Sequence, residues 1–127
     1  MTYGVSTYLA NALLNHAFRA TTYTPPTTIY AKIHTGDPGS AGTSNASAAT
    51  TRVATTWAAA ASGAIALSAS PQFTLTATET IAAVSFWDAS TSGNFLFSAQ
   101  ATTSKGGVSG DIIILATAPI TITPLAA

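Results

Sequence analysis

From Thr27 onward the sequence is a succession of short apolar runs separated by glycine, proline and serine. In the run "TIYAKIHT", Ile29 and Ile33 fall on one face of an extended strand and His34 on the other, which is the alternation of a half-buried strand. Runs of this kind recur at near-regular spacing and are too short for helices. Residues 27–124 are therefore predicted to form an antiparallel β-sandwich, jelly-roll or immunoglobulin-like, of about six to eight strands.

One amphipathic helix is predicted ahead of the strands, over residues 6–19. Leu9 and Leu13 recur at helical spacing, and Ser6 or the threonine after it can cap the first turn. The proline pair that starts at Pro25 cannot continue a helix, so the chain must leave it before that point. The expected fold is therefore mainly β with a single N-terminal helix.

The length and composition of the chain exclude several classes of protein. Its 127 residues suit one domain, and no repeat or linker divides residues 1–127. Four basic residues are too few and too scattered for a nucleic-acid footprint. No apolar run approaches the roughly 20 residues of a membrane-spanning helix, and the N-terminus lacks the features of a signal peptide. We expect neither nucleic acid nor membrane as a partner.

Charge is scarce in this sequence. Charged residues make up 6% of the chain, against about 25% in an average soluble domain. Alanine, serine and threonine fill roughly half of the positions, so the surface is polar but carries little repulsion. Because near-neutral surfaces promote association, we hypothesise that much of this surface is covered by neighbouring molecules in an assembly.

The loop "TGDPGSAGTSN" holds residue types that could carry chemistry. His34 and Asp37 could form a metal pair or an acid–base pair, but metal sites need three or four ligands and no further ligand is near in sequence. The alternative is that His34 points outward from its strand and Asp37 opens a turn, as Asp-Pro-Gly favours. A phosphate loop would need a Gly-Lys-Ser/Thr end that is missing here. We predict no catalytic residue, no cofactor and no metal.

Aromatic residues form the remaining cluster, at Trp57, Phe86, Trp87, Phe95 and Phe97. They could stack on sugars or fill the core of a sandwich, and the second role is commoner. Phe86 and Trp87 are adjacent, so they point to opposite faces of one strand. The one outside the main core, taken to be Trp87, becomes a candidate for an interface, where tryptophan is enriched.

Several motifs follow one another in a specific order. They are the helix "YLANALLNHAFR", the linker and strand "TYTPPTTIYAKIHTGDPGSAGT", the strand "TTRVATTW", the hairpin "FWDASTSGNFLFSAQATTSK" and the ending "SGDIIILATAPITIT". In this order they resemble a family of small structural proteins of tailed bacteriophages, along essentially the whole chain. The resemblance implies a virion component, usually a minor tail, tail-tip or fibre-associated protein, and supplies no catalytic residue.

The function expected from the sequence is that of a non-enzymatic building block of the virion, present in multiple copies beside other virion proteins. Alternatives are a head decoration protein that stabilises the capsid lattice and a carbohydrate-binding module that contacts a host-surface glycan. Deletion of residues 39–45 is expected to leave the fold intact while weakening assembly. The residues expected at an interface are Trp87, Thr35, Gly36, Asp37, Pro38 and Gly39.

Overall fold

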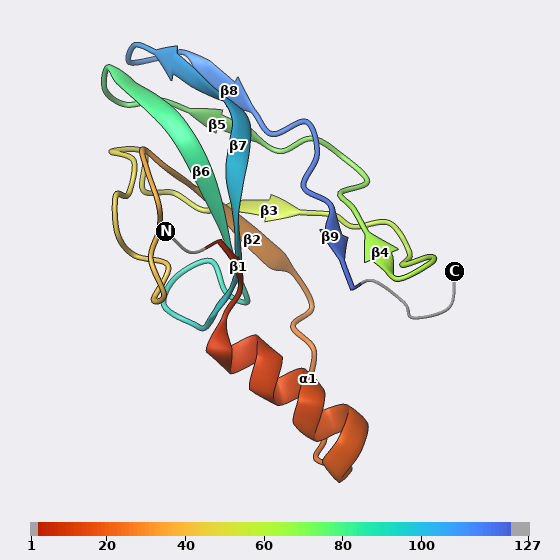
Figure 1. The fold of residues 1–127 in the computed structure, drawn as a ribbon. Helices are drawn as coiled ribbons and strands as arrows, with labels where there is room; N and C mark the ends of the chain where they lie inside the picture. Colours follow the sequence, from red (N-terminus) through yellow and green to blue (C-terminus); the bar gives the residue numbers. More distant parts are fainter. Residues whose placement is uncertain (1–2, 123–127) are drawn as a thin grey trace.

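Residues 3–122 of this computed structural model comprise one helix and nine antiparallel strands (Figure 1). In chain order the elements are β1 (Gly4–Val5), α1 (Thr7–Arg19), β2 (Ile29–His34), β3 (Val53–Thr55), β4 (Ala64–Ile65), β5 (Gln72–Thr74), β6 (Glu79–Trp87), β7 (Phe95–Gly107), β8 (Ile112–Ile114) and β9 (Ile120–Thr121). The prediction of a mainly β, antiparallel fold with one N-terminal helix is confirmed.

The strand count and the predicted ends differ in detail from the sequence expectation. Three of the nine described strands have two residues each, and one of these, β1, precedes the helix. Residues 123 and 124, where the sandwich was expected to end, lie outside the described residues. That residues 1–127 form a single domain stays a prediction.

Capping hydrogen bonds define both ends of the helix α1. Ser6 is the N-cap, and its Oγ accepts the backbone N–H of Leu9 at 3.1 Å. Ala20 adopts a left-handed conformation with φ 52°, and the N–H of Thr21 donates to the carbonyl of Asn15 at 3.2 Å. Beyond this cap the chain turns back along α1 and enters β2 (Figure 1).

Five strands form the central sheet, in the order β1-β7-β6-β2-β3. β6 and β7 make the predicted hairpin, and Ile33 of β2 pairs with Val84 of β6, which in turn pairs with Ala99 of β7. Because these residues are neighbours across the sheet, they share one face. The predicted alternation in β2 is confirmed on this face, since Ile33 is buried in the core and Ile29 packs against it.

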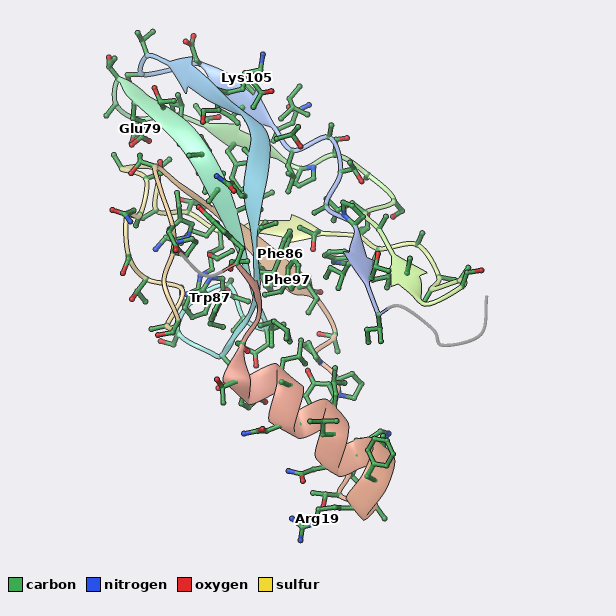
Figure 2. The ribbon with its side chains drawn as sticks, viewed as in Figure 1. Arg19, Glu79, Phe86, Trp87, Phe97 and Lys105 are labelled. Atoms are coloured by element: carbon green, nitrogen blue, oxygen red, sulfur yellow. The ribbon has the colours of Figure 1, made fainter. Side chains whose placement is uncertain are left out.

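The core lies on this apolar face of the sheet. Phe73 from β5, with Leu75 just after it, packs with Ile33, Ile81 and Phe86. β5 pairs with β8, and β4 pairs with β9, so two small sheets accompany the large one. Proline at 71 stands immediately before β5, as expected of a residue that cannot donate within a ladder. Figure 2 shows the Phe86 and Phe97 side chains close together at the centre of the molecule.

Candidate interaction surfaces

The loop after β2 is closed by its own hydrogen bonds. The Asp37 carboxylate accepts the N–H of Gly39 at 2.8 Å, which is the turn chemistry predicted for Asp-Pro-Gly. Asn45 closes the other side: its Nδ2 donates to the carbonyl of Asp37 at 2.8 Å, and its own carbonyl accepts the N–H of Thr35 at 2.8 Å. The segment is thus an ordered turn that ends β2, which answers the ambiguity left by its composition.

The same loop packs onto the second face of the central sheet. Pro38 is fully buried, and Gly42, with φ +71°, lies against the rings of Phe95 and Trp87. A Cβ added at Gly42 would stand 2.6 Å from the Phe95 ring. These contacts argue against the expectation that residues 39–45 can be deleted without harm to the fold.

His34 lies beneath this loop, and the expectation that it points outward is wrong. Its side chain is 0% exposed, with Nδ1 2.9 Å from the Ser44 carbonyl and Nε2 2.7 Å from Ser85 Oγ. Since a carbonyl only accepts, Nδ1 carries the proton, and the Ser85 hydroxyl donates to Nε2. The Ser85 oxygen also accepts Nε1–H of Trp87 at 2.8 Å. Alternation alone could not predict this burial, because it depends on the loop covering the face.

The His34 environment favours a neutral ring. Burial lowers the pKa of His34 below its ordinary value, the hydrogen bond with Ser44 opposes this, and the nearby Lys32 ammonium lowers it further. Ser85 and His34 have the contact of a nucleophile and its base, but both side chains are inaccessible to a substrate. Within residues 3–122 no three histidine, cysteine or acidic side chains gather in a way that could hold a metal.

Trp87 is held on this face by Arg52. The Arg52 guanidinium carbon lies 3.9 Å from the centroid of the Trp87 ring, and its Nη1 donates to the carbonyls of Ala89 and Ser92 at 2.8 and 2.7 Å. Trp87 is 6% exposed and contacts Phe95 with ring centroids 5.6 Å apart. Phe86 and Trp87 do point to opposite faces, as predicted, yet both are buried in the chain (Figure 2).

The six predicted interface residues therefore differ in accessibility. Thr35 is exposed, three residues of the turn are half-buried, and Pro38 and Trp87 are buried. The structure brings the turn and Trp87 to the same face, since Gly42 of the loop touches the tryptophan ring. Whether they contact a neighbouring molecule stays a prediction.

Sequence reasoning missed two residues of this face, Arg52 and Ser85. Ser85 could have been found from its position two residues before Trp87 on the same strand, which puts the two side chains on one face. Arg52 offered a weaker signal, as one of four basic residues in a nearly uncharged chain. No local pattern relates it to the turn at residues 89–92.

Besides the turn, the surface has a cleft of about 590 Å³ beside the apolar face of the central sheet. Phe73, Ile81 and Val84 are among the side chains that line it, with Thr103 and Lys105 from the far part of β7. Its walls are mainly apolar and it gathers no set of titratable groups, so it offers van der Waals contact rather than chemistry.

The helix α1 exposes several large apolar side chains. None of its residues is buried, and Figure 1 shows it projecting from the sheets. Phe18 is 82% exposed and Leu14 57%, with Tyr8 and Leu13 also exposed. Among the described residues, no helix is long and apolar enough to cross a membrane.

The described residues thus form a β-rich protein whose accessible features are a turn, an apolar cleft and an uncovered helix. The chain belongs to the family described as podophage GP4 fiber I protein gp80, whose family model matches residues 4–123. It is thus a phage fibre-associated structural protein and a component of the virion, made in the host cell. A search of curated proteins found no match.

Proposed function

We propose that this chain is a non-enzymatic, fibre-associated or minor tail component, present in multiple copies and bound to other virion proteins. The observation that carries the proposal is the family match, which spans residues 4–123 and so includes both the helix and the sheets. The mechanism is geometric: small side chains on flat β surfaces pack closely and lose little conformational entropy when they are covered.

The charge balance supports assembly from many copies. The chain has four basic and four acidic residues, so identical molecules repel one another weakly when they are brought together. The acidic groups that lie near the sheets bond within the chain: both carboxylate oxygens of Asp88 accept hydrogen bonds from Asn94, and Glu79 accepts the hydroxyl of Ser47 and the N–H of Ala48. Little charge is left to oppose contact.

We propose that the turn at Thr35–Gly39 contacts a neighbouring virion protein. Trp87 lies beneath the loop and holds the turn in place. Trp87 supports the loop through Gly42, and the turn offers the exposed Thr35. An arginine in place of Thr35 adds bulk and charge at the surface. We expect Thr35→Arg to reduce incorporation into particles while the purified chain keeps its melting temperature, and a loss of folding would contradict this role.

The test of the proposed function is the location of the chain in the particle. Electron microscopy of particles that carry a labelled copy should show density at the tail or its fibres. Density spread over the head would instead indicate a decoration protein and overturn the proposed position. Binding on a glycan array that is lost in Trp57→Ala would indicate a carbohydrate-binding module; the half-buried Trp57, packed edge-on to Phe86 at 5.3 Å, gives that role little support.

A further inference from the structure

Two of the four basic residues of the chain lie side by side on the second face of the central sheet, the face that carries Trp87. Ala31 of β2 pairs with Val53 of β3. One step further along this register, Arg52 stands opposite Lys32. Residues opposite each other in a sheet share a face, and like charges in such positions destabilise the pair. The fold therefore holds two cations together at a cost to the isolated chain.

Lys32 has no internal partner for its charge. Its side chain is half-buried, and within residues 3–122 its Nζ makes no hydrogen bond and no ion pair. No buried side-chain nitrogen in this part of the chain lacks a partner, so the unbonded Nζ reaches the surface. Burial lowers the pKa of Lys32, and the Arg52 guanidinium lowers it further. The surroundings of Lys32 thus disfavour its charge, and a bound anion would favour it.

Arg52 keeps hydrogen-bond donors for a ligand. Its Nη1 donates to the carbonyls of Ala89 and Ser92, which anchors the guanidinium over the Trp87 ring. The donors on Nε and Nη2 have no acceptor among the described residues. A guanidinium that is already fixed loses little freedom when it binds a carboxylate. Arg52 is thus an oriented donor beside the ammonium of Lys32.

The acidic side chains of this chain are engaged elsewhere. Each of the four accepts a hydrogen bond from a group of its own chain. The pairs are Asp37 with Gly39, Glu79 with Ser47, Asp88 with Asn94 and Asp111 with Val108. Asp88 raises the pKa of Arg52, against the larger effect of burial, but none of the four pairs with Lys32 in the described part of the chain. A second copy would therefore bring no unengaged acidic side chain to this site, and the complement must come from a different molecule.

We propose that Lys32 and Arg52 form a binding site for one carboxylate, supplied by an aspartate or glutamate side chain of a different virion protein. This inference rests on the proposed function, in which the chain is bound to other virion proteins, and it names the chemistry of one contact. A guanidinium edge can bind both oxygens of a carboxylate, and the ammonium supplies a further donor. Two cations suit a single anionic group, whereas a nucleic-acid backbone requires a longer basic track.

NMR titration of the purified full chain with a short glutamate-rich peptide tests the site. The Arg52 Nε–H and the Lys32 amide should shift, and the shifts should shrink as salt is added because the contact is electrostatic. Lys32→Gln should weaken binding roughly tenfold. The matched control is Lys105→Gln, which removes an exposed lysine on β7 and should leave binding unchanged.

A glutamine-rich peptide of the same length should cause no shift at these positions. Equal shifts with both peptides, no shift with the glutamate-rich peptide, or binding unaffected by Lys32→Gln would overturn the site. Glucuronate is the second probe, and if it bound more tightly than the peptide, it would replace the protein partner by an acidic sugar and overturn the proposal.

Thermal unfolding separates this role from a structural one. Lys32→Gln relieves the like-charge pair, so the melting temperature of the purified chain should stay the same or rise. A fall would mean that Lys32 serves the fold and would contradict the proposal. Lys32 is the residue to change because Arg52 also holds the β6–β7 loop.

Incorporation into particles links the site to the proposed function. Lys32→Gln should reduce the amount of the chain in purified particles, and Lys105→Gln should not. Normal incorporation of Lys32→Gln would refute this contact alone and leave the proposed function standing, whereas absence of the wild-type chain from tails would refute the function.

Discussion

The strand β6 and the helix α1 differ sharply in burial. Of the nine residues of β6, six are buried, including every residue from Ala83 to Trp87, whereas α1 has thirteen residues and buries none. The body of the protein therefore completes its core without the apolar side of the helix. A 13-residue helix is marginal by itself in water, so α1 depends on its cap and on the linker that follows it.

The largest expected change in the free energy of unfolding comes from substitution of Phe86, and it tests the contrast in burial between β6 and α1. Phe86 is 1% exposed, with rings of Trp57 and Phe97 against it, so Phe86→Ala should lower the free energy of unfolding by about 3–5 kcal/mol. Phe18→Ala, at the exposed end of α1, should change the stability of the monomer by less than about 0.5 kcal/mol. Urea denaturation of both variants measures the difference, and equal losses would erase the contrast.

Gly42 is expected to show the next largest effect. Gly42→Ala combines an unfavourable positive φ with a Cβ in contact with the Phe95 ring, and should cost about 1–3 kcal/mol of unfolding free energy. The matched control is Gly110→Ala, where φ is +95° but the added Cβ meets open space. If thermal unfolding shows the two variants to be equally stable, the loop does not pack on Trp87 and Phe95 as described.

The buried His34 makes stability depend on pH. Its pKa is lowered in the folded chain, so the unfolded chain takes up a proton first as pH falls below about 6.5. Stability should be constant above that pH and decline below it, by up to about 1.4 kcal/mol between pH 7.5 and 5.5. In His34→Gln this dependence should shrink, and urea midpoints at the two pH values measure it. A stability that rises on acidification would contradict a neutral, buried imidazole.

Arg52→Ala should show an effect close in size to that of the His34 titration. Arg52→Ala removes two hydrogen bonds to the β6–β7 loop and the contact with the Trp87 ring, at a cost of about 1–2 kcal/mol. Arg52→Lys keeps the charge but loses the planar fork, so it should recover only part of the stability. Full recovery in thermal melts would mean that charge alone matters at this position.

Local sequence signals predicted the parts of this fold that depend on neighbouring residues. The cap at Ser6, the apolar spacing of α1, the alternation around Ile33 and the Asp37 turn all follow from chemistry within a few positions. The helix was expected over residues 6–19 and α1 spans Thr7–Arg19. Only its exposure was not predicted, because amphipathic spacing indicates a face that will be covered without indicating which molecule covers it.

Contacts between distant residues account for what the sequence did not predict. His34 is buried because Ser44 and Ser85, ten and 51 positions away, both reach its ring. Trp87 is covered because Arg52 crosses to the loop at Ala89 and Ser92. Pairing of β5 with β8 joins residues 72–74 to residues 112–114. Each of these depends on register across the sheet, which short runs of similar composition specify weakly.

Hydrogen exchange most directly tests the contrast between β6 and α1. Amides of β6 should stay protected over long exchange times, whereas those of α1, which buries none of its residues, should exchange much faster. Protection of α1 equal to that of β6 would show that the helix is held as firmly as the core, and would contradict the account.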